Sequence, residues 1–257
     1  MIPRDSMRCR SNMYAQLFCV LQCCNATMTL LSAELTGTKI DSRESGPVNV
    51  QLSEWLWRGS ESRALAQKAL HSGFIKGIKS GLLDPRHFGS FFVQDAVFCF
   101  HVVQHLKIAL QKYPSDSTLT AVLQEQIRTN EKYTRDLFQQ WHIANPNGIL
   151  LGKAAEEYVK FEREVAEDMS PLYLLIAMLP CEKLWSWLAM ELQYEISATN
   201  VYRFWVDDHV SIDPVLATFI DENAGRYNVD LDTAMFIYQK ALYWEGEFFE
   251  SASAGSN

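Results

Sequence analysis

Prolines placed between long helical patterns constrain the fold of this 257-residue chain more than any other sequence feature. Proline is tolerated in the first turn of a helix but not in its interior, so these prolines mark helix starts. They are Pro85, Pro114, Pro146, Pro171 and Pro214. Alternation of apolar and polar residues with period two is nearly absent, so strands are not expected. The sequence predicts an all-α single domain of six or seven helices.

Turn and cap residues support these helix limits. Asp84 and Asp116 supply N-cap side chains, and Gly81, Gly148 and Gly225 mark turns. The predicted helices cover 52–71, 85–113, 116–142, 149–168, 170–196, 198–210 and 229–252, with a shorter turn of helix near 213–224.

The charge balance is acidic, with 31 Asp and Glu against 23 Lys and Arg and a formal net charge of -8. Nucleic acid is not an expected partner, because its phosphates select basic surfaces. The hydrophobic fraction of 48% is enough for a substantial core. No apolar segment has the length expected of a membrane span, so no membrane partner is expected either.

Four of the six cysteines lie in the first two dozen residues. They form neither a spaced disulfide framework nor a repeated CxxC zinc pattern. The other two, Cys99 and Cys181, read as free thiols.

Residues 1–48 form an N-terminal extension that precedes the helical domain, 49–257, and has two open interpretations. Three arginines precede the apolar stretch 13–21, and small residues near position 33 would suit cleavage of a secretory signal peptide. Polar residues interrupt that stretch, so an extra N-terminal helix or a frayed extension is the alternative. The protein is expected in the cytoplasm, or outside the cell if the extension acts as a signal.

A cysteine follows a proline inside the apolar run 178–185. The neighbours of Cys181 at helical spacing are all apolar, so its thiol faces whatever the helix buries. Pro180 either kinks the helix or begins a new one, whose positive end would lower the pKa of the thiol. Cys181 is a candidate nucleophile, and a small buried hydrophobe is the alternative.

Two carboxylates also lie on apolar helix faces. Asp95 has phenylalanines and a cysteine at helical spacing, and Glu245 has alanine, leucine and two phenylalanines. A buried ionised carboxylate must be paired, hydrogen-bonded, protonated or in contact with a ligand. Together with Cys181 they form a plausible pocket, although each could instead meet a basic residue or a helix end. Tyr158 follows two alanines and is either a member of this pocket or a core tyrosine.

His101 and His105 lie four residues apart, a spacing that can place two imidazoles on one metal ion. No further ligand cluster accompanies them, and a solvated or half-buried face is the favoured interpretation. No metal and no cofactor is expected.

Four motifs occur in a fixed order along residues 50–252. Residues 88–95 read F-x3-F-x-Q-D, 179–181 read L-P-C, 200–205 read N-V-Y-R-F-W, and 245–249 read E-G-E-F-F. They resemble the motifs of the TenA family of heme oxygenase-like proteins, known as thiaminase II or aminopyrimidine aminohydrolase. Valine and phenylalanine replace a family proline and tryptophan in the last two.

The resemblance implies a heme oxygenase-like bundle of about seven helices around a central pocket, assembled as a dimer or tetramer of identical chains. It implies that Cys181 is the nucleophile, Glu245 the acid and base, and that Asp95 and Tyr158 hold a pyrimidine ring. Three positions where the family has tyrosine are replaced here, and these also belong to the implied substrate site. They are Phe98, Trp185 and His209.

The implied activity is cleavage of the bond between the aminopyrimidine methylene and the thiazolium of thiamine, or of the corresponding bond in a related aminopyrimidine. The acceptor is water, as in a hydrolase, or another nucleophile, as in a transferase. A non-catalytic binder or scaffold on the same fold is the main alternative, and heme or redox chemistry ranks last because clustered His and Glu ligands are missing from the sequence.

Overall fold

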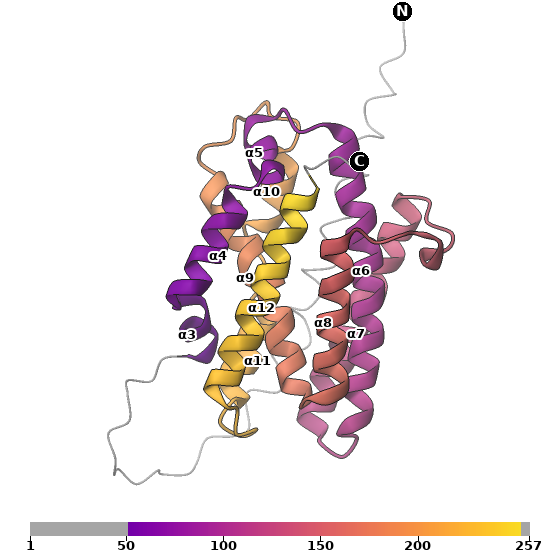
Figure 1. The fold of residues 1–257 in the computed structure, drawn as a ribbon, viewed down its shortest axis with the longest axis vertical. Helices are drawn as coiled ribbons and strands as arrows, with labels where there is room; N and C mark the ends of the chain where they lie inside the picture. Colours follow the sequence, from indigo (N-terminus) through magenta and orange to yellow (C-terminus); the bar gives the residue numbers. More distant parts are fainter. Residues whose placement is uncertain (1–50, 253–257) are drawn as a thin grey trace, which may run out of the picture.

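The computed structural model describes residues 51–252, which form ten α-helices, one 3-10 helix and no strand within that range (Figure 1). The predicted all-α fold is confirmed. The N-terminal extension predicted over 1–48 lies outside the described residues. The helices are α3 (Leu52–Arg58), α4 (Ser60–Leu70), α5 (Gly73–Ser80), α6 (Pro85–Lys112), α7 (Ser117–Gln140), η4 (Pro146–Gly148), α8 (Lys153–Asp168), α9 (Pro171–Leu192), α10 (Arg203–His209), α11 (Val215–Asn223) and α12 (Leu231–Ser251).

The structure has more helices than predicted, and the additional ones lie at the N-terminal end of the described residues. The helix predicted over 52–71 is divided at Gly59, whose backbone is extended. Helix α5 was not predicted, because glycines at both 73 and 77 disfavour a helix. Packing overrides that preference, since the side chains of α5 that face inward, Phe74, Ile75 and Ile78, are buried.

Helix α6 and helix α7 begin where their caps were predicted. The Asp84 carboxylate accepts a hydrogen bond from the backbone N–H of Arg86, with Pro85 in the first turn. The Asp116 carboxylate accepts one from the N–H of Leu119 at 3.0 Å. These bonds satisfy N–H groups that a helix leaves unpaired at its start.

Helix α9 is the apolar centre of the bundle and packs on α8, α10, α11 and α12 (Figure 1). By length and composition it is apolar enough to cross a membrane, which the sequence analysis did not anticipate. Burial explains its composition, because 72% of its most apolar stretch lies inside the protein. A helix that is hydrophobic on all sides is expected at the core of such a bundle.

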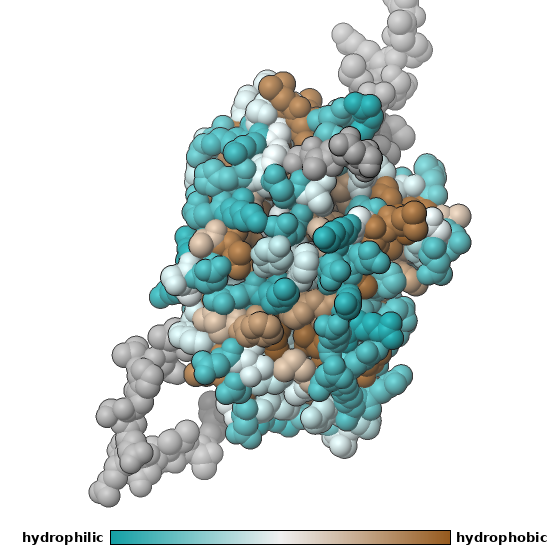
Figure 2. All heavy atoms as spheres, in the orientation of Figure 1, coloured by the Kyte–Doolittle hydropathy of each residue, from teal (hydrophilic) through white to brown (hydrophobic). Residues whose placement is uncertain are grey.

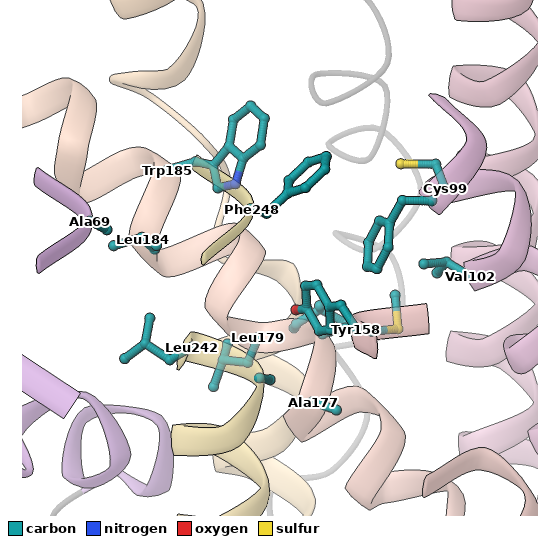
Figure 3. Close-up of a cluster of buried hydrophobic side chains, with 14 of the residues drawn as sticks. Ala69, Cys99, Val102, Tyr158, Ala177, Leu179, Leu184, Trp185, Leu242 and Phe248 are labelled. Atoms are coloured by element: carbon teal, nitrogen blue, oxygen red, sulfur yellow. The ribbon is translucent and has the colours of Figure 1, made fainter. Parts of the chain in front are cut away.

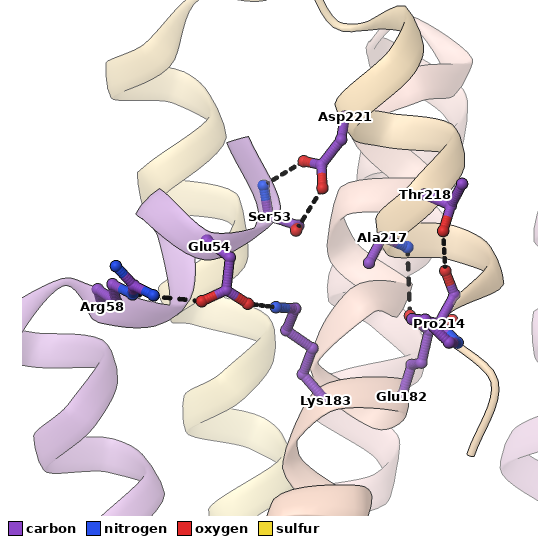
Figure 4. Close-up of polar contacts among 9 residues, drawn as sticks. All are labelled: Ser53, Glu54, Arg58, Glu182, Lys183, Pro214, Ala217, Thr218 and Asp221. Carbon is purple, nitrogen blue, oxygen red and sulfur yellow. Dashed lines mark hydrogen bonds and ion pairs between the residues drawn. The ribbon is translucent and has the colours of Figure 1, made fainter. Parts of the chain in front are cut away.

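Side chains from distant helices cap two short helices beside α9 (Figure 4). The Asp221 carboxylate accepts hydrogen bonds from the backbone N–H and the hydroxyl of Ser53, at 2.7 and 2.8 Å, and so holds the start of α3. The Glu182 carboxylate accepts from the N–H groups of Leu216 and Ala217, at 2.8 and 3.2 Å, at the start of α11. Helices α3 and α11 are thereby fixed to the rest of the bundle.

Replacing Asp221 with alanine should lower the free energy of unfolding by about 1–3 kcal/mol, because the buried N–H and hydroxyl of Ser53 lose their acceptor. Urea unfolding of the full chain measures the change. The matched control is Glu222→Ala, which removes an exposed carboxylate one residue away and should change stability by less than about 0.5 kcal/mol. Equal losses in the two variants would contradict the capping role of Asp221.

Candidate active site

Four helices bring the predicted site residues together at the centre of the bundle. Asp95 lies on α6, Tyr158 on α8, Cys181 on α9 and Glu245 on α12. Helix α8 packs on α6, α9 and α12, and α9 packs on α6 and α12. Asp95 and Glu245 both lie close enough to Cys181 to raise the pKa of its thiol. Figure 3 shows side chains from these helices, among them Tyr158 and Trp185, gathered in the same apolar interior.

Asp95 is 6% exposed and its carboxylate accepts a hydrogen bond from the hydroxyl of Tyr133 at 3.0 Å. The Cys99 thiol lies 3.9 Å from the other carboxylate oxygen. Burial raises the pKa of Asp95 to about 7, and the two hydrogen bonds oppose that rise. Near neutral pH this carboxyl group therefore exists in both protonation states.

Tyr133, on α7, is a site residue that the sequence analysis missed. Nothing in the sequence marks Tyr133 as a site residue, because half-buried tyrosines on amphipathic helices are common. Only the packing of α7 on α6 brings its hydroxyl to Asp95. Burial, followed by the neighbouring Asp95 carboxylate, raises the pKa of Tyr133 well above its ordinary value, so it is a hydrogen-bond donor.

Glu245 is 3% exposed and has two donors. The hydroxyl of Tyr158 donates to one carboxylate oxygen at 3.3 Å, and the indole N–H of Trp185 donates to the other at 3.2 Å. Burial raises the pKa of Glu245 to about 8, and the charge of Asp95 adds to the rise. Glu245 therefore holds a proton at neutral pH and can donate it.

Cys181 is exposed to solvent although its neighbours on α9 are buried. The buried neighbours are Pro180 before it and Leu184 and Trp185 after it. Burial nevertheless raises the pKa of the thiol well above its ordinary value, with Glu245 and Asp95 adding to the rise. The thiol is protonated at rest.

Pro180 lies inside α9, which continues through it to Leu192, so no new helix begins there. The sequence allowed two alternatives at Pro180, a kinked helix or the start of a new one. The second alternative, a helix N-terminus that lowers the pKa of the Cys181 thiol, is not found. The missing N–H of Pro180 still frees the carbonyl of Ile176 four residues back. The proline therefore affects backbone hydrogen bonding near Cys181 without providing a positive helix end.

The three residues that replace family tyrosines all lie around these groups. The rings of Phe98 and Tyr158 are 4.6 Å apart, and those of Trp185 and His209 are 4.9 Å apart. His209 Nδ1 lies 2.6 Å from the backbone carbonyl of Trp205, which can only accept, so Nδ1 carries the hydrogen. Burial lowers the pKa of His209 to about 4. The imidazole is neutral at pH 7, with an acceptor at Nε2.

His105 was expected on a solvated or half-buried face, but it is 2% exposed. Its Nδ1 lies 3.5 Å from a carboxylate oxygen of Glu162, which is 1% exposed. Glu162 lies one turn beyond Tyr158 on α8 and adds to the rise in the pKa of Cys181 and of Glu245. Glu162 could not be predicted as the partner of His105, because the two residues are distant in the chain.

Within residues 51–252, no group of three or more His, Cys, Asp or Glu side chains is arranged to hold a metal ion. The described site instead offers a protonated acid, a second carboxyl group with a pKa near neutrality, and a thiol. This set can protonate a ring nitrogen, hold a polar edge of the ring and form a covalent bond to carbon.

An all-α bundle in which two buried carboxyl groups lie near a cysteine thiol is the class of structure that the fold and the candidate site define. The family model described as TENA/THI-4/PQQC matches residues 60–213, more than half of the chain. The chain belongs to the TENA/THI-4/PQQC family.

Solved structures show the same fold. A TenA homologue from P. horikoshii OT3 has a TM-score of 0.66 at 19% identity, covering 80% of this chain and all of its own. A TenA family transcription regulator from Silicibacter sp. TM1040 has a TM-score of 0.66 at 18% identity, covering 78% of this chain and 96% of its own. A TenA homologue from Pyrococcus furiosus has a TM-score of 0.63 at 17% identity, covering 78% of this chain and 99% of its own.

One curated relative is the hydroxymethylpyrimidine/phosphomethylpyrimidine kinase THI21 of Saccharomyces cerevisiae. It is 24% identical over a match of 200 residues that covers 70% of this chain. The chain spans 35% of the length of that relative, so the two are not equivalent as whole proteins.

The raised pKa values of Asp95 and Glu245 predict how stability depends on pH. The folded protein binds these protons more tightly than the unfolded chain, where the ordinary pKa values are 3.8 and 4.5. Their stabilising contribution is therefore complete below about pH 4 and is lost as the pH rises through about 7 to 8. Asp95→Asn and Glu245→Gln should each flatten the decline of unfolding free energy between pH 4 and pH 8.

Urea unfolding across this pH range measures the effect. Glu182 and Asp208 also have raised pKa values and remain in all variants, so the difference from the unchanged protein isolates each carboxyl group. Glu247→Gln, two residues from Glu245 and ion-paired with Lys68, is the control that should keep the original slope. An unchanged slope in Asp95→Asn and Glu245→Gln would contradict the pKa values.

Proposed function

We propose that this protein cleaves the bond between the methylene of a 4-aminopyrimidine and its substituent, as in thiamine, by covalent catalysis through Cys181. The observation that carries the proposal is the placement of the Cys181 thiol close to two buried carboxyl groups with raised pKa values. Family membership and the thiamine-pathway name of the yeast relative support a thiamine-related role.

Asp95 and Glu245 take different roles because their surroundings differ. Asp95, oriented by the hydroxyl of Tyr133, is proposed to hold the exocyclic amino group and the adjacent ring nitrogen. Glu245, oriented by Tyr158 and Trp185, is proposed to protonate the opposite ring nitrogen. A carboxyl group with a pKa of about 8 is a suitable acid at neutral pH.

Protonation of the ring by Glu245 makes the adjacent ring carbon electrophilic and leaves a carboxylate. That carboxylate takes the proton of the Cys181 thiol while the sulfur forms a bond to the ring carbon. The substituent then leaves the methylene with the electron pair of the C–N bond, as a neutral base if it began as a cation. The high resting pKa of Cys181 suits this order, since the thiolate forms only beside a protonated substrate.

An incoming nucleophile then forms a bond to the exocyclic methylene carbon, and one that carries an O–H, N–H or S–H loses that proton to solvent. The C–S bond breaks with its electrons returning to sulfur. Glu245 gives its proton to that sulfur and takes back the proton from the ring nitrogen, so that both residues return to their starting forms. A turnover with water, a thiol or a primary amine releases one proton, whereas pyridine has no proton to lose and remains in the product as a pyridinium cation.

The acceptor is water in a hydrolase and an amine or thiol in a transferase. The hydroxyl groups that family tyrosines would supply are absent at Phe98, Trp185 and His209. Nε2 of His209 provides an acceptor for an O–H or N–H of the nucleophile. Product analysis by mass spectrometry, with thiamine alone and with added pyridine, distinguishes the two: a pyridine adduct identifies transfer.

A non-catalytic aminopyrimidine-binding protein is the second candidate. It is favoured by the loss of the three hydroxyl groups and by a thiol that is protonated at rest. It predicts that an aminopyrimidine raises the melting temperature while thiamine is not consumed.

We also infer that identical chains assemble into a dimer or tetramer, which sedimentation of the full chain tests.

Cys181→Ser should lower thiamine cleavage by at least about a thousandfold, because a serine hydroxyl is a much poorer nucleophile than a thiol. Glu245→Gln should lower it comparably, since the amide cannot supply a proton. Thiamine loss and product appearance are followed by mass spectrometry, and urea unfolding shows that each variant folds.

Glu247→Gln is the matched control on α12 and should keep the original rate, because its carboxylate forms an ion pair with exposed Lys68 at the surface. Full activity in Cys181→Ser would remove the covalent mechanism. Binding of an aminopyrimidine by an unaltered protein that cleaves none of the compounds would establish the second candidate.

A further inference from the structure

Two buried polar side chains beside the candidate site have no part in the chemistry proposed above. They are His105 on α6 and Glu162 on α8, which are 2% and 1% exposed. His105 Nδ1 and Glu162 Oε2 lie 3.5 Å apart, and neither atom has a hydrogen-bond partner within residues 51–252. Burying such groups costs free energy unless they meet a partner, so each of these two side chains depends on the other.

Glu162 lies on the face of α8 that packs inward. The buried residues of α8 are Ala155, Tyr158, Glu162, Val165 and Ala166, and Glu162 is the only charged one among them. Figure 2 shows mainly hydrophilic atoms where Figure 1 places α8, because the other charged side chains of this helix are not buried. Glu162 is therefore an exception to the amphipathic pattern of α8.

The pair lies one helical turn from Tyr158. Glu162 follows Tyr158 by four residues on α8, which is about 6 Å along the axis. The same two helices meet again where the rings of Phe98 and Tyr158 are 4.6 Å apart, and Phe98 precedes His105 by two turns on α6. Helices α6 and α8 lie side by side (Figure 1). The contact between His105 and Glu162 thus keeps α8 against α6 at Tyr158, whose hydroxyl donates to Glu245.

The charge of Glu162 acts on the site from the α8 side. Burial is the main cause of the raised pKa of four neighbouring groups, and the negative charge of Glu162 adds to the rise in each. These groups are Cys99 on α6, Tyr158 on α8, Cys181 on α9 and Glu245 on α12. Burial, followed by the charge of His105, lowers the pKa of His101 one turn away on α6. The negative end of the pair therefore acts on the site and the positive end on His101.

A fixed negative charge near Cys181 and Glu245 has two effects on the proposed chemistry. It favours the protonated forms of both groups, so the thiol and the acid keep their protons before a substrate binds. It also favours the cationic form of a ring that has accepted a proton from Glu245, because opposite charges attract more strongly in an interior that excludes water.

We propose that His105 and Glu162 are positioning residues of this site: they hold α8 against α6 beside Tyr158 and direct a fixed negative charge toward Cys181 and Glu245. The inference rests on the proposed function, because it assigns a role in the same site. Neither residue forms a bond to the substrate in this role. Both act through the groups that do the chemistry.

The first test measures the charge near Cys181 without a substrate. Two chains are compared, one with Glu245→Gln and one with Glu245→Gln and Glu162→Gln, so that position 245 stays uncharged in both. Loss of the Glu162 charge should raise the rate at which iodoacetamide alkylates Cys181 at neutral pH by about three- to thirtyfold, because the pKa of the thiol falls and more thiolate is present. Peptide mapping by mass spectrometry separates exposed Cys181 from the other cysteines.

A double-mutant cycle tests whether the two residues act as a pair. In the same background His105→Gln should have about the same effect as Glu162→Gln, because a buried carboxylate that loses its cation takes up a proton instead. The chain with both changes should react less than about 1.5-fold faster than either. Glu164→Gln, which removes an exposed carboxylate two residues farther along α8, should leave the rate unchanged.

Additive effects of His105→Gln and Glu162→Gln would overturn the pairing. Urea unfolding shows which variants fold, and if one single variant does not fold, the rate in the other decides whether the charge acts on Cys181.

The pH profile of thiamine cleavage connects the pair with the acid. Glu162→Gln as a single change should move the alkaline limb of kcat/KM to lower pH by about half to one pH unit, since Glu245 loses a charge that favours its protonated form. The kcat should fall more than the KM rises, because the charge acts on the ring after it has gained a proton. A purely structural defect would lower activity and leave the alkaline limb in place.

The failures of the two proposals differ. If the unaltered protein cleaves thiamine while Glu162→Gln changes neither the alkylation rate nor the alkaline limb, the pair has no electrostatic role and the proposed function stands. If the unaltered protein cleaves no aminopyrimidine while loss of Glu162 still speeds alkylation, the proposed function fails and the pair remains a source of charge at Cys181.

Discussion

Exclusion of water from the contact between α9 and α12 is the constraint on which the rest of the structure depends. Helix α9 is apolar over most of its surface, and the face of α12 that meets it carries Glu245. In water this carboxyl group would be ionised at neutral pH. Removed from water, it retains a proton to about pH 8, because its two hydrogen bonds do not offset the cost of burying a charge.

The segment around Cys181 is held from both sides. The two residues after Cys181 point to different helices: Glu182 caps α11, and Lys183 forms an ion pair with Glu54 of α3. Glu54 also pairs with Arg58 on its own helix, and Asp221 fixes the start of α3 to α11 (Figure 4). These contacts form a closed set around α9. Movement of the chain at Cys181 would break several of them together, which keeps the thiol in one position.

Much of the fold and part of the site could be predicted from the sequence, for identifiable reasons. Helix limits followed from Pro85, Asp84 and Asp116, because caps and prolines act within a few residues. Asp95 and Glu245 could be recognised as unusual, because burying an ionised carboxylate among phenylalanines costs free energy. Short helices such as α5 could not be predicted, since tertiary packing rather than local preference stabilises them.

The partners of the predicted residues were beyond the reach of sequence reasoning. Tyr133 meets Asp95, and His105 meets Glu162, only because α6 packs on both α7 and α8. The exposure of Cys181 could not be predicted either. Apolar neighbours at helical spacing look the same in the sequence beside a solid core and beside an internal space. Motif resemblance predicted which polar residues form the site, and only the packing of the helices shows what each one touches.

The order of the helices along the chain has a consequence for biosynthesis. Asp95 lies in the first half of the chain, whereas Glu245 lies on the last helix. A nascent chain that lacks α12 therefore leaves Asp95 and Cys181 hydrated, with nothing to desolvate them from that side. The carboxyl group of Glu245 therefore acquires its raised pKa only after α12 has been synthesised and has docked on α8 and α9. In a chain that stops before α12, the set of buried polar groups described here is incomplete.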